Sequence, residues 1–327
     1  MEQSKAKSKF ISKPLFMQSF KSLRLQWLIM TAGACLIFII INLAIGSKNI
    51  FTNIDMGQVS QYIKDEDLNW LTVLGLLENM GFSLSRIQAM SQMDLNSVLA
   101  ELIYKITGVL LPMIYVIIAS NKLVVSQVND GSMAYVLSTP TNRKTVVRTQ
   151  YVFLMASIVA MYLAITISAV GSEGISTLIV AQKGSPVKWV PVRTLLFCLG
   201  SFMAMFCIGG ICFGASCFFN KSNYAIAVGG GICVLSFICC IMGLFGNEAF
   251  VAVGIGVKPM YYFNYLSLFF LIDTHSMSAL CNAVFLKTID LTAECFDWIW
   301  EIGILIVIGS VVAFIGGRRF VKKDLPL

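Results

Sequence analysis

The side chains best suited to chemistry in this chain are ten cysteines and a single histidine, His275. Cys207, Cys212 and Cys217 repeat every five residues within one apolar run. Each step of five residues turns an α-helix by about 140° beyond a full turn, so the three thiols cannot share one helix face. There is no Cys-x-x-Cys pair, and a lone histidine in a polar loop is more often incidental than catalytic. We therefore expect no metal site and no catalytic residue.

Motifs that would capture energy or bind a cofactor are also missing from the sequence. A phosphate-binding loop of the type Gly-x-x-x-x-Gly-Lys-Ser/Thr needs a Gly-Lys dipeptide, and the chain has none. It has no His-Glu-x-x-His or Gly-x-Ser-x-Gly motif and no second histidine for a triad. We expect this chain to be no enzyme by itself and to hold no cofactor. Any ATPase must then be a separate subunit.

The composition is that of a membrane protein. Hydrophobic residues make up 57% of the chain and charged residues 13%, against about 45–50% and about 25% in soluble domains. A spanning helix needs roughly 20 consecutive apolar residues, and the short alternating segments of a membrane β-barrel are missing. We predict an all-α polytopic membrane protein with six transmembrane helices, at residues 27–46, 106–125, 151–170, 194–217, 225–245 and 301–317.

The distribution of charge orients these helices. Their interiors contain no Asp, Glu, Lys, Arg or His, which argues against a carrier driven by protons or sodium. If the N-terminus is cytoplasmic, the cytoplasmic segments hold 15 of the 24 Lys and Arg but 3 of the 17 Asp and Glu. The net charge of +7 thus reflects topology, and no nucleic-acid surface is expected. The predicted cytoplasmic segments are 1–26, 126–150, 218–224 and 318–327, and the extracellular ones are 47–105, 171–193 and 246–300.

The N-terminal segment has the pattern of an amphipathic helix. Ser12 offers a cap and Pro14 suits the first turn. We predict a helix that lies in the cytoplasmic interface of the membrane; the alternative is one continuous helix that includes the first span. The apolar face would consist of Phe16, Phe20, Leu23 and Trp27.

Two extracellular segments are long enough to fold as small modules. We expect residues 47–105 to form short helices, the last of which runs into the second span. In residues 246–300, the stretch Met260–Ile272 is too short to span a membrane, which indicates a re-entrant or interfacial helix pair. Cys281 and Cys295 lie in the same segment, where they could form a disulfide or remain free thiols.

Small residues recur at four-residue spacing in the fourth and sixth predicted spans. Such faces allow two helices to approach closely. We predict helix-packing sites at Gly210, Gly214, Gly309, Ala313 and Gly317.

The sequence between the second and third spans is polar, basic and sharply bounded. Asp130 can cap a helix that begins at Gly131 or Ser132 and runs until Pro140 forbids its continuation. We expect this helix to lie across the cytoplasmic face, where its apolar side could fill a groove on another protein; the alternative is a loop helix that packs against its own bundle. Arg143 would reach toward an acidic partner. The apolar side consists of Met133, Val136 and Leu137, with Tyr135 nearby.

This segment resembles the cytoplasmic motif of ABC-2 type permeases, the membrane subunits of bacterial ATP-driven exporters. That motif reads Glu-x-x-x-Gly-Thr-Leu-Glu-Tyr-Leu-Leu-Ser-x-Pro-x-Ser-Arg, and residues 131–143 align with it without gaps. The closing residues 320–327 are similar to the family's tail, an aromatic followed by basic residues and Asp-Leu-Pro. The chain departs from the motif upstream of the glycine, where the family's acidic residue is replaced by Gln127 or shifted to Asp130, and its outer segment after the first span is longer than that of a minimal member.

The resemblance implies that two permease subunits pair, as a homodimer or a heterodimer, and that two ABC ATPase subunits dock beneath them. ATP and Mg²⁺ would be bound by the ATPase. The helix after the second span would be a coupling helix that transmits ATP-driven movement. Its ATPase-coupling residues would be Gly131, Ser132, Met133, Tyr135, Val136, Leu137, Pro140 and Arg143.

The function expected from this resemblance is export across a bacterial cytoplasmic membrane, with both termini in the cytoplasm. A charge-free membrane domain rich in aromatic residues and Met suits an amphipathic or apolar substrate. Family members with small permeases commonly export peptides such as bacteriocins and cytolytic toxins, so we expect amphipathic or antimicrobial peptides as substrates. The alternatives are an exporter of drugs or lipids and a non-transporting membrane scaffold or sensor.

Overall fold

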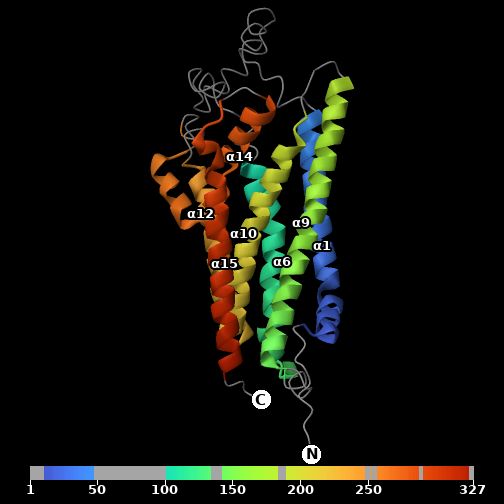
Figure 1. The fold of residues 1–327 in the computed structure, drawn as a ribbon, viewed down its shortest axis with the longest axis vertical. Helices are drawn as coiled ribbons and strands as arrows, with labels where there is room; N and C mark the ends of the chain where they lie inside the picture. The colour runs from blue at the N-terminus through green and yellow to red at the C-terminus, as the bar shows by residue number, and fades with distance from the viewer. Residues whose placement is uncertain are drawn as a thin grey trace, which may run out of the picture.

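A computed structural model describes residues 11–47, 101–133, 142–182, 189–246, 251, 256–286 and 290–323. Within these ranges every regular element is a helix, and the long helices stand side by side in a bundle (Figure 1). This confirms the predicted all-α polytopic class. The main helices are α1 (Lys13–Ser47), α6 (Gly108–Leu123), α9 (Arg143–Gln182), α10 (Pro191–Phe218), α12 (Gly231–Leu244) and α15 (Asp297–Lys322).

Shorter helices extend or connect the main ones. The π-helix η1 (Glu101–Thr107) leads into α6, and α7 (Val125–Asn129) follows it. The short α11 (Ser222–Ala225) and the π-helix η2 (Ile226–Gly230) lead into α12. Between α12 and α15 lie η3 (Lys258–Leu266), η4 (Leu268–Leu271), α14 (Thr274–Cys281), η5 (Asn282–Leu286) and η6 (Ala293–Phe296).

The two ends of the bundle can be named from the helix termini that lie there. We call the end at which α1 begins and α15 ends the basal end, and the opposite end the distal end (Figure 1). At the basal end, Lys122 near the end of α6 donates to the Ser22 carbonyl of α1 at 3.2 Å. At the distal end, Asn42 of α1 donates to the Ser172 hydroxyl of α9 at 2.9 Å. Successive main helices therefore alternate in direction.

Seven helical segments of the described residues are long and apolar enough to cross a membrane, one more than the six predicted. The additional segment, Leu268–Phe285, is broken at Asp273. The Asp273 carboxylate accepts hydrogen bonds from the backbone N–H of His275 at 3.0 Å and of Ser276 at 3.1 Å, so it caps the start of α14. Hydropathy over the whole segment masks this break in the helix.

The chain before this break descends along α12 from the distal end. Asn264 donates to the Gly243 carbonyl at 3.4 Å, and the Ser267 hydroxyl donates to the Ser236 carbonyl at 2.8 Å. Ser236 lies about two turns, or about 10 Å, closer to the basal end than Gly243. The chain then turns back through α14, which packs against α10 and η6. The segment therefore enters the bundle and leaves it at the same end.

The N-terminal amphipathic segment is continuous with the first span, as in the alternative considered above. α1 runs without a break for 35 residues, and its first turns pack along α9. The Ser19 hydroxyl donates to Gln150 at 2.9 Å, and the rings of Phe16 and Phe153 meet edge-on at 5.2 Å. The separate interfacial helix predicted for residues 1–26 is therefore wrong in the part that the structure describes. Because the face toward α9 stays buried on both sides of the expected boundary, the helix has no reason to break there.

α9 is also longer than its predicted span of 151–170. Its 40 residues correspond to about 60 Å, twice the hydrocarbon thickness of about 30 Å. Residues 171–182, expected in an extracellular loop, are helical. Hydropathy locates the part of a helix that lipid can cover, and the helix itself continues for as long as its polar residues find partners.

The core of the bundle is built around α10, which contacts α6, α9 and α15. Every residue from Cys207 to Cys217 is buried. Pro112 inside α6 cannot donate to the carbonyl four residues earlier, and that carbonyl, of Gly108, accepts the Tyr162 hydroxyl of α9 at 3.0 Å. A polar group that a proline leaves open is thus satisfied by a neighbouring helix, as a membrane interior requires.

Candidate coupling site and helix-packing faces

The predicted coupling segment begins with a sharp turn after α7. The Asp130 carboxylate accepts the Ser126 hydroxyl at 3.2 Å and the Asn129 amide at 3.4 Å, both from the preceding helix. Gly131 follows with φ +72°, in the left-handed region that glycine enters without steric cost. Asp130 was expected to cap the following helix, and its carboxylate instead closes the end of α7. Gly131 lets the chain turn there.

Ser132 and Met133 begin the next helical turn. Ser132 is exposed, and its hydroxyl donates to the Gln127 carbonyl at 3.2 Å. Met133 is only 2% exposed and belongs to the hydrophobic core of this chain. The alternative of packing against its own bundle therefore describes Met133 better than a partner's groove does. The other residues predicted for this helix lie outside the described residues: Tyr135, Val136, Leu137 and Pro140.

Arg143 is the first residue of α9 and is tied to the end of α15. Its Nη1 donates to the Lys323 carbonyl at 2.8 Å, so the structure places it against this chain's own tail. Lys323 in turn donates from Nζ to the Phe218 carbonyl at the end of α10, at 2.6 Å. The Arg319 guanidinium lies over the Phe218 ring, 4.6 Å from its centroid. Burial, with the nearby Arg319 charge, lowers the pKa of Lys323.

The small residues predicted in the fourth and sixth spans face each other between α10 and α15. A Cβ added to Gly210 would lie 2.7 Å from the Cα of Gly309, and one added to Gly309 would lie 2.8 Å from the Cα of Cys207. Both distances are below those seen between real side chains and backbone. The two helices therefore meet backbone to backbone, which only glycine allows at these positions.

The contact continues toward the basal end, with one change from the predicted set. A Cβ added to Gly316 would lie 2.6 Å from the Cα of Gly214, and Ala313 is buried. A Cβ added to Gly317 would instead lie 3.2 Å from a methyl carbon of Val147 in α9. Seven residues bring a helix back to within about 20° of its starting direction, whereas eight overshoot by about 80°. Gly316 therefore takes the place in the α10 contact that the four-residue spacing gave to Gly317.

All ten cysteines lie within the described residues, and none of them forms a disulfide. Cys281 and Cys295 are both buried, and the disulfide considered between them is not formed. The Sγ atoms of Cys212 in α10 and Cys233 in α12 lie 3.5 Å apart, a pairing between helices that sequence spacing cannot show. No group of three or more His, Cys, Asp or Glu side chains within the described residues could hold a metal ion.

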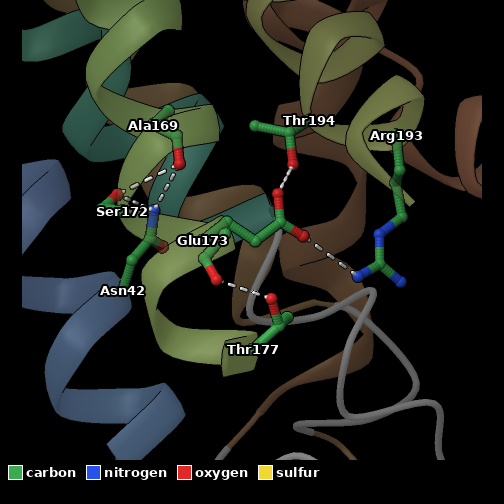
Figure 2. Close-up of polar contacts among 8 residues, drawn as sticks. Asn42, Ala169, Ser172, Glu173, Thr177, Arg193 and Thr194 are labelled. Carbon is green, nitrogen blue, oxygen red and sulfur yellow. Dashed lines mark hydrogen bonds and ion pairs between the residues drawn. The ribbon is translucent and has the colours of Figure 1, made fainter. Parts of the chain in front are cut away.

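A polar cluster joins α1, α9 and α10 at the distal end (Figure 2). Glu173 of α9 accepts the hydroxyl of Thr194 and pairs with Arg193 at 3.8 Å, both from the first turn of α10. One turn earlier, Asn42 of α1 donates to the Ala169 carbonyl at 3.3 Å as well as to Ser172. These contacts fix the distal ends of three helices and satisfy polar groups there.

Sequence reasoning missed the contacts of Lys323 and of Glu173. Lys323 could have been found, since basic residues just after a helix often bind the open carbonyls of a helix end. Glu173 was assigned to a loop, and nothing in its local sequence indicates its partners on α10.

One family comparison covers nearly the whole chain. The family described as ABC-2 family transporter protein matches residues 21–325. The matched range begins inside α1, includes the segment between α7 and α9, and ends beyond α15. No curated protein and no solved structure matches the chain.

Proposed function

Because this chain belongs to the ABC-2 family of transporter proteins, we propose that it is the membrane subunit of an exporter that moves amphipathic peptides across a bacterial cytoplasmic membrane. The match confirms the family that residues 131–143 and 320–327 suggested. It makes the chain a multi-pass permease subunit of an ABC transporter and implies an ABC ATPase partner and pairing of the membrane subunits. The observation that carries the proposal is a single family match across the long helices and the segment between α7 and α9.

In this proposal the basal end faces the cytoplasm and the ATPase. Basic residues gather on the basal parts of the helices, as the positive-inside rule requires of cytoplasmic ends. They include Lys21, Arg24, Lys122, Arg143, Lys144, Arg318 and Arg319. The segment between α7 and α9 joins two helix ends at the basal end, and in this proposal it meets the ATPase through Tyr135, Val136 and Leu137.

ATP hydrolysis takes place in the partner subunit, which holds ATP and Mg²⁺. This chain has no phosphate-binding loop and supplies no catalytic residue. Its part is to form the pathway, together with a second permease subunit, and to change that pathway when the coupling segment moves. Such coupling requires contacts that differ between the two states of the ATPase.

The proposed substrates are amphipathic peptides, such as toxins, bacteriocins or other antimicrobial peptides. The membrane-facing side chains are apolar and aromatic, and the predicted outer segments carry most of the acidic residues. An acidic outer surface would attract a cationic peptide as it leaves.

The test is transport in inside-out proteoliposomes that contain the chain and its ATPase. The probes are a fluorescent cationic amphipathic peptide, a fluorescent phospholipid and a cationic dye. ATP-dependent uptake of the peptide alone supports the proposal, whereas uptake of the lipid or the dye alone would replace the peptide assignment. An ATPase without its phosphate-loop lysine is the control. A chain that binds no ATPase would be a scaffold or sensor, and the proposal would be wrong.

A paired variant tests the coupling segment itself. Val136→Asp with Leu137→Asp should abolish binding of the ATPase, because two charges would replace apolar contact. Asn142→Asp is the control, since Asn142 is exposed between the same two helices and is not among the predicted coupling residues. If the paired variant binds the ATPase and transports like the wild type, these residues are not the docking site.

A further inference from the structure

Three contacts at the basal end join α9, α10 and α15, and we call them the basal clasp. They are the hydrogen bond from Arg143 to the Lys323 carbonyl, the hydrogen bond from Lys323 to the Phe218 carbonyl, and the stacking of Arg319 on the Phe218 ring. The first contact joins α9 to α15, the second joins α15 to α10, and the third strengthens the second. A continuous series of contacts therefore runs from the first residue of α9 to the last residue of α10.

The charges in the clasp suit the helix ends that they touch. The last carbonyls of a helix have no partner within the helix and carry partial negative charge. Lys323 and Arg143 supply cations to the ends of α10 and α15. Arg143 itself stands at the start of α9, where a positive charge is unfavourable for its own helix. Its hydrogen bond to α15 offsets that cost. Arg143 therefore stabilises the connection to α15 more than it stabilises α9.

The clasp continues into a stiff pair of helices. α10 and α15 run parallel with backbone contacts at Gly210 and Gly309 and again at Gly214 and Gly316. Side chains between two helices can adjust by changing rotamer, but touching backbones cannot. A displacement applied at Lys323 must therefore move α10 and α15 together.

The clasp also follows the coupling segment closely in the chain. Nine residues, 134–142, separate Met133 from Arg143, which is the first residue of α9. The other side of the segment is anchored through Met133 and Asp130 to the core and to α7. Movement of the segment can therefore be transmitted along two routes, one through α7 to α6 and one through Arg143 to Lys323.

We propose that Arg143 and Lys323 are positioning residues that transmit displacement of the coupling segment to the paired helices α10 and α15. The inference rests on the proposed function, because it needs an ATPase that displaces the segment. A clasp that only anchors the tail would affect folding and assembly. A clasp that transmits movement also determines how much peptide is moved for each ATP hydrolysed.

The experiment uses the assembled permease–ATPase complex in inside-out proteoliposomes with the fluorescent cationic amphipathic peptide as probe. Lys323→Met removes the contact with Phe218, and Lys322→Met is its matched control because Lys322 is exposed and carries the same charge. Arg143→Ala removes the other contact, and Lys144→Ala is its control for the same reasons. Lys323→Arg and Arg143→Lys keep a donor and should restore coupling in part.

The measured quantity is peptide transported per ATP hydrolysed, together with complex yield and melting temperature. Lys323→Met and Arg143→Ala should each lower this ratio at least fivefold in complexes that assemble and melt like the wild type, while both controls keep it within twofold. Should Lys323→Met fail to assemble, Arg143→Ala tests the same link, because it leaves the bond from Lys323 to Phe218 in place.

Two results would overturn the inference. In the first, both variants transport with the wild-type ratio. In the second, the ratio falls only in step with complex yield and melting temperature, which shows an anchor alone. A wild-type complex that does not form, or that moves no peptide, instead refutes the proposed function, and the clasp's role falls with it.

Discussion

Gly210→Ala should push α10 and α15 apart and lower the thermal stability of the protein. The added methyl group would lie 2.7 Å from the Cα of Gly309, with that residue's carbonyl atoms closer still. Carbon atoms at contact are about 3.5–4.0 Å apart, so the helices must separate by about 1 Å. Since the obstacle is backbone, no rotamer change can relieve it.

Overpacking of this kind costs about 1–3 kcal/mol and occasionally more. Because the obstacle is backbone, the upper end of about 3 kcal/mol applies. The better helix propensity of alanine returns up to about 1 kcal/mol, which leaves a net destabilisation of about 2 kcal/mol. At about 2–4 °C per kcal/mol, the melting temperature should fall by about 4–8 °C. Gly231→Ala is the matched control, because a Cβ there has nothing within 4 Å. It should leave the melting temperature unchanged or raise it.

The cysteines provide the assay. Nine of the ten are buried and Cys35 is partly so, so a thiol-reactive dye that fluoresces on labelling reports unfolding of the detergent-solubilised protein on heating. The reasoning would be refuted if Gly210→Ala melts within 1 °C of the wild type. It would also fail if Gly231→Ala loses as much stability as Gly210→Ala.

Further predictions concern the coupling segment, the thiols and the distal end. Met133→Asp should lower the melting temperature of the permease alone by 5 °C or more, because an unpaired buried charge costs several kcal/mol. Ser132→Asp should not lower it. If the Met133→Asp permease is stable and fails only to bind the ATPase, Met133 lies at the partner. Maleimide labelling in denaturant without reductant should give ten adducts by mass spectrometry, and eight would show a disulfide. Thr194→Val should cost about 1.5–3 kcal/mol in thermal unfolding, through loss of a hydrogen bond to a charged group. Glu173→Gln removes the ion pair with Arg193 and should cost about 0.2–1 kcal/mol, as for an exposed pair. A larger cost would show that the hydrogen bond from Thr194 weakens as well, and a double-mutant cycle of Glu173 and Thr194 measures this.

The sequence predicted most of the fold because a membrane limits the possible structures. Helices must satisfy their own backbone groups in lipid, so long apolar runs located the main helices. The predicted helix ends were less accurate. α9 extends from Arg143 to Gln182, and the polar residues near its two ends fall outside the apolar run by which a span is recognised. The segment from Leu268 to Phe285 was hard to classify, because its break depends on the bonds that Asp273 makes with His275 and Ser276.

Features of the site that depend on the local spacing of residues were predictable, whereas features that depend on how the helices are arranged around them were not. The glycine faces of α10 and α15 were visible as small residues at four-residue spacing, but the choice of Gly316 over Gly317 depends on the direction of a third helix. Met133 was assigned to a partner's groove because its own bundle could not be seen from the sequence. Arg143 and Lys323 are 180 residues apart, so no local pattern connects them.

Photo-crosslinking from the coupling segment to the ATPase tests the central claim most directly. A photoreactive amino acid placed at Leu137 in membranes that contain both subunits should give a permease–ATPase adduct. The same group at Val307, which is 60% exposed on the membrane-facing side of α15, should give none. If Leu137 yields no adduct, or if both positions yield it equally, the segment between α7 and α9 is not where the ATPase docks.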